Sequence, residues 1–161
     1  MNLYFMRHGI AVDRAGPGTK SDDRARALTP KGIKRMEKAA KGLLSLSLSF
    51  DRILTSPFQR ARQTAQIVAE ALDMQDRLEE IQELCPDQSV QDLLSGLAAY
   101  ASKKNILLVG HEPLLSSTVS FLLSGSAGAE IRLKKGGLCC LEVGGVPPKK
   151  SAVLHWALTP K

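Results

Sequence analysis

The segment Asn105–Val109, NILLV, is apolar at every position after its first residue. It lacks the alternation of a half-exposed strand, so it predicts a strand buried on both faces. Such a strand needs helices on both sides of a mainly parallel sheet. Gly110 and Pro113 bracket the turn that follows it. The runs Asn2–Arg7 and Asp51–Thr55 predict two further strands.

Amphipathic helical patterns separate these strands. Thr29 is a favourable N-cap and Pro30 suits the first helical position, so a helix is expected to start there. Ser56–Pro57 repeats this start signal after the second strand. Apolar spacing over Val90–Ala101 and Leu115–Leu122 marks two more helices. The stretch Leu44–Phe50 alternates Leu and Ser and fits either a fraying helix or a strand.

Two late runs, Leu138–Val143 and Ala152–Leu158, predict strands that close the chain as a hairpin. The polar, charged segment Asp13–Leu28 predicts a long loop, and loops of that length in compact domains are usually functional or mobile. The pattern as a whole indicates one domain over residues 1–161. Its expected fold is a three-layer α/β/α sandwich with a mainly parallel central sheet and an antiparallel edge strand.

Composition narrows the classes of partner. The formal net charge of +6 favours an anionic partner. The basic residues are spread along the chain without a basic and aromatic stripe, which argues against nucleic acid. Three cysteines, of which Cys139 and Cys140 are adjacent, fit a reducing compartment. The first apolar run, Leu3–Met6, is too short for a signal sequence, and no run is long enough to span a bilayer. A cytoplasmic protein without membrane contact is expected.

Charged and imidazole side chains follow the predicted parallel strands. Arg7, His8 and Gly9 end the first strand, Arg60 lies in the first turn of the next helix, and His111 follows the buried strand. The carboxyl ends of parallel strands meet at one edge, where ligands bind. Guanidinium groups match phosphate oxygens, and a neutral imidazole is a competent nucleophile. Gly9 allows the backbone to approach an anion closely. The pattern therefore predicts a phosphate site.

The order of these motifs resembles the histidine phosphatase superfamily, which is phosphoglycerate mutase-like, and within it the short, SixA-like phosphohistidine phosphatases. The similarity covers most of the chain. It rests on the motifs YFMRHG, LTPKG, ILTSPFQRARQTA and LVGHEP, at residues 4–9, 28–32, 53–65 and 108–113.

The resemblance implies roles for individual residues. His8 would accept the phosphoryl group and form a phosphohistidine that water hydrolyses. Arg7, Arg60 and His111 would bind the phosphoryl oxygens, with His111 contributing positive charge. No metal or other cofactor is implied, because these cations do the work of a divalent ion.

The resemblance also implies an acid for the leaving group. Glu83 is the favoured candidate, because it occupies the matching stretch between Arg60 and His111. Glu112, beside His111, and Asp13, in the loop near His8, are the alternatives. A general acid must lie within hydrogen-bond distance of the leaving group, so the choice depends on the positions of these side chains in the fold.

The chain lacks the long insertions that cover the site in larger members, so an open site is expected. An open site favours a phosphorylated protein, with phosphohistidine in a signalling protein as the preferred substrate. Two alternatives stand beside this: an enzyme acting on small phosphorylated substrates such as sugar phosphates, and a non-catalytic domain that binds phosphoproteins.

Overall fold

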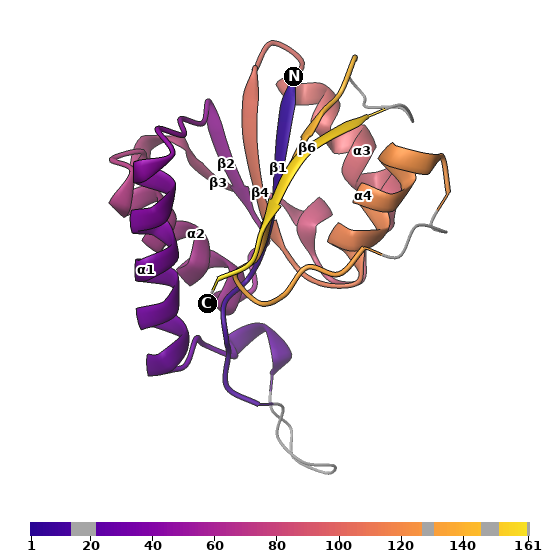
Figure 1. The fold of residues 1–161 in the computed structure, drawn as a ribbon. Helices are drawn as coiled ribbons and strands as arrows, with labels where there is room; N and C mark the ends of the chain where they lie inside the picture. Colours follow the sequence, from indigo (N-terminus) through magenta and orange to yellow (C-terminus); the bar gives the residue numbers. More distant parts are fainter. Residues whose placement is uncertain (14–21, 127–130, 146–151, 161) are drawn as a thin grey trace.

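Six strands form one sheet, in the order β3-β2-β4-β1-β5-β6, between two layers of helices (Figure 1). The computed structural model describes residues 1–13, 22–126, 131–145 and 152–160. The strands are β1 (Asn2–Arg7), β2 (Arg52–Thr55), β3 (Leu78–Glu80), β4 (Asn105–Gly110), β5 (Leu138–Glu142) and β6 (Val153–Leu158). The α-helices are α1 (Pro30–Ser45), α2 (Gln59–Ala71), α3 (Val90–Gly96) and α4 (Leu114–Ser124). Short 3-10 helices are η1 (Asp23–Ala25), η2 (Gln75–Arg77), η3 (Gln82–Leu84) and η4 (Leu97–Tyr100).

The sheet is parallel over β1 to β4, whereas β5 runs antiparallel to both β1 and β6. This confirms the expected mainly parallel sheet with an antiparallel edge. In the register of β1 with β4, Arg7 lies opposite Gly110. The next residues along the two strands, His8 and His111, therefore leave the sheet side by side.

Both faces of the central strands are apolar, as the unbroken NILLV run predicted. Leu107 and Val109 of β4 pack with α1 and α2, whereas Ile106 and Leu108 pack with α3 and α4. Figure 1 shows these helix pairs on opposite sides of the sheet. The three-layer prediction is therefore confirmed. No helix in the described ranges is both long and apolar enough to cross a bilayer.

The adjacent cysteines face opposite layers of the sandwich. Cys140 belongs to the core under α1 and α2, and Cys139 to the core under α3 and α4. Both are buried and free. Successive side chains of a strand point to opposite faces, so the pair cannot form a disulfide, as the sequence indicated.

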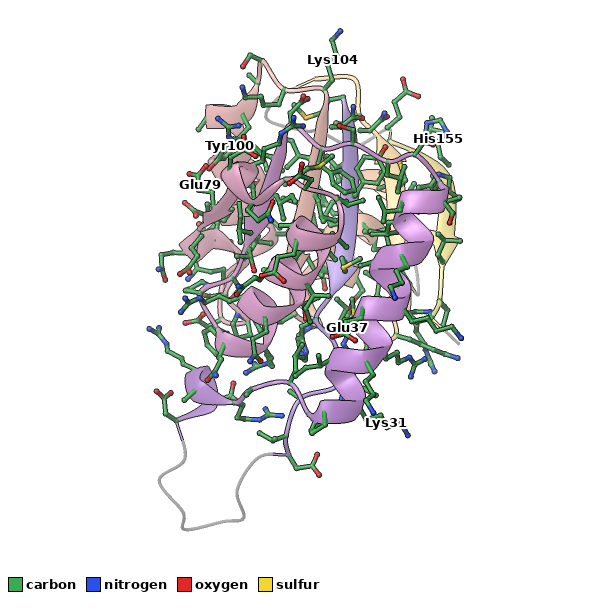
Figure 2. The ribbon with its side chains drawn as sticks, turned by 90° about the vertical axis from the view of Figure 1, so that its left-hand side faces the viewer. Lys31, Glu37, Glu79, Tyr100, Lys104 and His155 are labelled. Carbon is green, nitrogen blue, oxygen red and sulfur yellow. The ribbon has the colours of Figure 1, made fainter. Side chains whose placement is uncertain are left out.

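The predicted start of α1 is confirmed. The Thr29 hydroxyl accepts a hydrogen bond from the Gly32 amide at 3.0 Å, and Pro30 is the first helical residue. The ambiguous stretch after Leu44 is helical only to Ser45. Figure 2 shows α1 from its outer side, with Lys31 in its first turn. That turn lies at the end of the molecule towards which β1 runs (Figure 1).

Three local predictions are wrong in detail. Helix α2 begins at Gln59 rather than at the Ser56–Pro57 signal, because the Ser56 hydroxyl makes other contacts described below. The helix expected over Val90–Ala101 changes to a 3-10 helix after Gly96. The predicted loop Asp13–Leu28 contains η1 and a bridge between Ala11 and Leu28, and its residues 14–21 lie outside the described part.

Candidate active site

A pocket of about 230 Å³ lies at the carboxyl ends of the parallel strands. Four of the residues named from the sequence line it, namely Arg7, His8, Arg60 and His111. They come from β1, from the first turn of α2 and from the end of β4, and the strand register brings these elements together. Arg26, Pro86, Glu112 and Lys135 complete the lining.

The imidazole of His8 is oriented with one nitrogen towards the arginine of α2. Nδ1 lies 2.7 Å from the Gly9 carbonyl oxygen, an acceptor, so Nδ1 carries the proton and donates it. Nε2 of the neutral ring is then an acceptor, and Arg60 Nε donates to it at 3.3 Å. A neutral imidazole with its Nε2 lone pair directed at a guanidinium is arranged to attack a phosphorus atom held there.

Burial keeps His8 neutral. It lowers the pKa of His8 to about 4, because a charged ring would lose its hydration. The bond to the Gly9 carbonyl opposes this shift, and the charges of Arg60, Arg7 and Lys135 add to it. At pH 7 Nε2 therefore carries no proton, and its lone pair accepts the hydrogen bond from Arg60.

The guanidinium of Arg60 is held by η1. It donates through one terminal nitrogen to the Asp23 carbonyl at 2.7 Å and through the other to the Asp23 carboxylate at 3.0 Å. Arg26 donates to the same carboxylate at 2.7 Å. Burial alone would raise the pKa of Asp23, but its bonds to Arg26 and Arg60 outweigh this and lower the pKa to about 2. Asp23 thus fixes two arginines that line the pocket.

Arg60 opposes the dipole of its helix and is nevertheless buried, with 3% of its surface exposed. The carboxylate of Asp23 offsets its charge, and its guanidinium lies 4.9 Å from the centre of the Phe58 ring. A cation in this unfavourable position is more readily explained by a function at the pocket than by the stability of the helix.

Gly9 is packed too tightly for any larger residue. A Cβ there would come within 2.8 Å of Met36 Cγ and 3.2 Å of Leu28 Cδ2. The Gly9 amide donates to the Thr64 hydroxyl at 3.0 Å, and this hydroxyl donates to the Arg60 carbonyl at 2.7 Å. Thr64 therefore ties the His8 loop to the first turn of α2.

His111 packs between two rings. Its ring centre lies 5.1 Å from those of His8 and Phe58, and its Nε2 lies 2.9 Å from the Ser56 hydroxyl. Burial, together with the charges of His8 and Arg60, lowers the pKa of His111 to about 3. His111 is therefore neutral at pH 7, which differs from the expectation that it contributes positive charge.

The three candidate acids lie in different places. Glu83 does not line the pocket; its side chain packs against Gly96 of α3, where a Cβ would lie 3.2 Å from Glu83 Cδ. Asp13 is exposed and lies outside the lining too. Glu112 does line the pocket, and the Ser116 hydroxyl donates to its Oε2. The role predicted for Glu83 has no support from this geometry.

Sequence reasoning missed five residues of the site. Asp23, Arg26 and Lys135 lie in segments without regular patterns, so no periodicity placed them near His8. Ser56 and Thr64 do lie in the quoted motif TSPFQRARQT, and their spacing from Arg60 was the available signal. Within the described residues, no three His, Cys, Asp or Glu side chains form a group that could hold a metal ion.

Comparisons with known proteins identify the family of this chain. The family model of the histidine phosphatase superfamily (branch 1) matches residues 3–85. An uncharacterized protein of Picosynechococcus sp. is 40% identical over 89% of this chain and 86% of its own. Phosphohistidine phosphatase SixA of Escherichia coli is 30% identical over 85% of this chain and 88% of its own. An adenosylcobalamin/alpha-ribazole phosphatase of Salmonella typhimurium is 27% identical over 89% of this chain and 91% of its own.

A comparison with solved structures leads to the same family. The structure of the protein histidine phosphatase SixA complexed with tungstate superposes with a TM-score of 0.84 and 25% identity, over 99% of this chain and 97% of that one. This chain belongs to the histidine phosphatase superfamily.

Proposed function

We propose that this chain is a phosphatase that hydrolyses phosphohistidine in a protein, through a covalent phosphoryl group on its own His8. One observation carries the proposal: Gly9 fixes the proton on Nδ1 of His8, and Nε2 faces Arg60 inside a cationic pocket. The similarity to phosphohistidine phosphatase SixA supports the choice of substrate.

The reaction has two displacement steps. In the first, Nε2 of His8 forms a bond to phosphorus as the bond from phosphorus to the substrate nitrogen breaks, and the departing imidazole keeps the electron pair. In the second, water attacks the phosphorus, the bond to Nε2 breaks, and inorganic phosphate leaves. Each step needs mainly alignment and neutralisation of the phosphoryl oxygens.

Charge in the pocket suits a phosphoryl dianion. Arg7, Arg26, Arg60 and Lys135 bring four cationic groups to it, against the carboxylates of Glu112 and of Asp23 beside it. The pocket volume of about 230 Å³ is small beside the usual range of about 300–1,000 Å³ for small-molecule sites. The pocket thus favours recognition of the phosphoryl group itself, with the rest of the substrate outside.

Glu112 is the acid that the geometry favours. Its Oε1 is buried without a partner among the described residues, while Oε2 accepts from Ser116. A carboxyl group in this position can exchange a proton with the leaving group. An imidazole leaves more readily than an alkoxide, so phosphohistidine makes a smaller demand on this group than a phosphate ester does.

A second candidate is a phosphatase of small phosphorylated molecules. It is favoured by the similarity to the alpha-ribazole phosphatase, which covers nearly the whole of both chains. A substrate panel separates the two: phosphohistidine in a protein is expected to give the higher kcat/KM, and a marked preference for a phosphorylated nucleoside or sugar would favour the second candidate.

The decisive experiment traps the intermediate. After brief incubation with a histidine-phosphorylated protein carrying labelled phosphate, acid-labile label is expected on His8, and His8→Ala is expected to lose at least about 1,000-fold in kcat/KM. His155→Ala is the matched control, because His155 is exposed on β6, at the end of the molecule opposite Lys31 (Figure 2). Parent activity in His8→Ala would overturn the proposal. Phosphoprotein binding without turnover would support a non-catalytic domain.

A further inference from the structure

Ser56 lies at the centre of a buried group of polar atoms beside the pocket. It is fully buried, and its hydroxyl lies 2.9 Å from Nε2 of His111. The Phe58 amide donates to the same hydroxyl at 3.3 Å. This bond occupies a lone pair of the Ser56 oxygen and leaves its O–H free to donate.

The other ring nitrogen of His111 has no partner. Nδ1 is buried and makes no hydrogen bond to the described residues, although His111 lines the pocket. The rings of His8 and Phe58 pack against the His111 ring, and the Ser56 hydroxyl contacts its Nε2. Buried polar atoms are nearly always paired, so Nδ1 is the atom that a ligand would satisfy.

We propose that Ser56 is a positioning residue: its hydroxyl donates to Nε2 of His111 and so keeps the proton on Nδ1, which then donates to the phosphoryl group. The proposal rests on the proposed function, because it takes the ligand to be a phosphoryl group. In the opposite tautomer, a lone pair on Nδ1 would face the oxygens of an anion, which is repulsive. Ser56 thereby turns a neutral imidazole into a donor.

Cys85 is the competing acceptor for the Ser56 hydroxyl. Burial raises the pKa of Cys85, so it remains a thiol, even though its interaction with Ser56 opposes that shift. Its own S–H points to Gln82 Oε1 at 3.6 Å. A thiol sulfur is a weak acceptor, whereas the imidazole lone pair is a strong one, so the hydroxyl donates to His111.

The first test is the tautomer in the parent protein. The chain has three histidines, so nitrogen–proton correlation spectra of labelled protein at pH 7 are readily assigned with His8→Ala and His155→Ala. The expected result is a proton on Nδ1 of His111, with and without inorganic phosphate. A proton on Nε2 would overturn the proposal. This measurement involves no turnover, so it is independent of whether the chain hydrolyses phosphohistidine.

The second test removes the hydroxyl. Ser56→Ala is expected to shift His111 towards the Nε2–H tautomer and to weaken binding of inorganic phosphate about 10- to 100-fold, as expected for one hydrogen bond to a charged group. Ser56→Thr should retain both properties. Ser120→Ala, which removes another buried hydroxyl that donates to Ser126, is the matched control. An unchanged tautomer and affinity in Ser56→Ala would overturn the proposal.

Discussion

At the scale of single residues, the pocket is marked by polar atoms that the protein leaves unsatisfied. Four buried side-chain atoms in the described residues have no hydrogen-bond partner, and three of them, Arg7 Nε, His111 Nδ1 and Glu112 Oε1, belong to the pocket lining. Leaving such atoms unpaired costs free energy. In the proposed reaction the two nitrogens would bind phosphoryl oxygens, and the carboxyl group of Glu112 would donate a proton to the leaving group.

The role of Glu112 depends on the leaving group. We expect Glu112→Gln to lower kcat about 100-fold for a phosphate ester with a poor leaving group and much less for p-nitrophenyl phosphate, since general acid catalysis contributes about 10²–10⁴-fold where the leaving group needs a proton. Steady-state kinetics on both esters measures this.

Glu83→Gln provides the comparison, because Glu83 lies outside the pocket lining. If Glu83→Gln shows the leaving-group dependence and Glu112→Gln does not, then the acid first expected from the sequence is the correct one.

Much of the site could be predicted at this scale. Arg7, His8, Arg60 and His111 follow strands with clear patterns, so topology alone brings them together. The charge of His111 could not be predicted, because it depends on burial beside His8 and Arg60. Which of the candidate acids lines the pocket could not be predicted for a similar reason: whether Glu83 or Glu112 faces it depends on how the chain turns after each strand, and no periodicity encodes that.

At the scale of elements, long segments were predictable and short ones were not. Strands β1 and β4 are recognisable as unbroken apolar runs, and α1 as apolar residues at helical spacing. Strand β3 and helix η1 have three residues each, and a three-residue segment shows no period. Their form is set by tertiary contacts, for example those of Asp23 with Arg60.

Helix η1 is the element whose loss is expected to affect catalysis most directly. Asp23→Ala removes the carboxylate that holds Arg60 and Arg26, although it leaves both cations in place. We expect kcat to fall about 10-fold or more, because the Arg60 guanidinium keeps its bond to the Asp23 carbonyl but loses the carboxylate, and is held less firmly beside Nε2 of His8. Hydrogen exchange at the η1 amides should rise in the same variant. Exposed Asp76→Ala is the control, and equal kcat in both variants would contradict the prediction.

Two glycines of α1 should respond in opposite directions. Gly42 is exposed, and a Cβ there meets nothing within 4 Å, so Gly42→Ala should raise the free energy of unfolding by about 0.5–1 kcal/mol. At Gly32 a Cβ would lie 2.1 Å from the Ile10 carbonyl oxygen, which also accepts from the Thr29 amide. Gly32→Ala should therefore lower the free energy of unfolding. Urea denaturation of both variants measures the difference, and a stabilising Gly32→Ala would contradict this packing.

At the scale of the whole molecule, the two pocket histidines make stability depend on pH. Their folded pKa values, about 4 for His8 and about 3 for His111, lie below the ordinary 6.5. Between these values the unfolded chain binds more protons, so the free energy of unfolding is highest above pH 6.5 and falls as the pH drops towards 4. The pKa of Asp23, lowered to about 2, affects the free energy of unfolding only at still lower pH, where this carboxylate becomes protonated.

Urea denaturation at pH 7 and pH 5 measures this dependence. The double variant His8→Asn, His111→Asn should lose most of the difference in free energy between the two pH values, whereas His155→Asn should keep it. A parent protein equally stable at pH 5 and pH 7 would show that its histidines are not buried as neutral rings.

Because Arg7 pairs with Gly110 across β1 and β4, the two histidines of the pocket are held by the centre of the sheet, apart from the residues that would select the substrate. His8 and His111 directly follow the two innermost strands, where any displacement would disrupt both apolar layers. Two other cations of the pocket lining lie instead on segments between elements: Arg26 between η1 and α1, and Lys135 between α4 and β5. Exchange of Arg26 and Lys135 is therefore a route to retargeting the proposed phosphatase to new leaving groups while His8, Arg60, His111 and the proposed acid Glu112 stay in place.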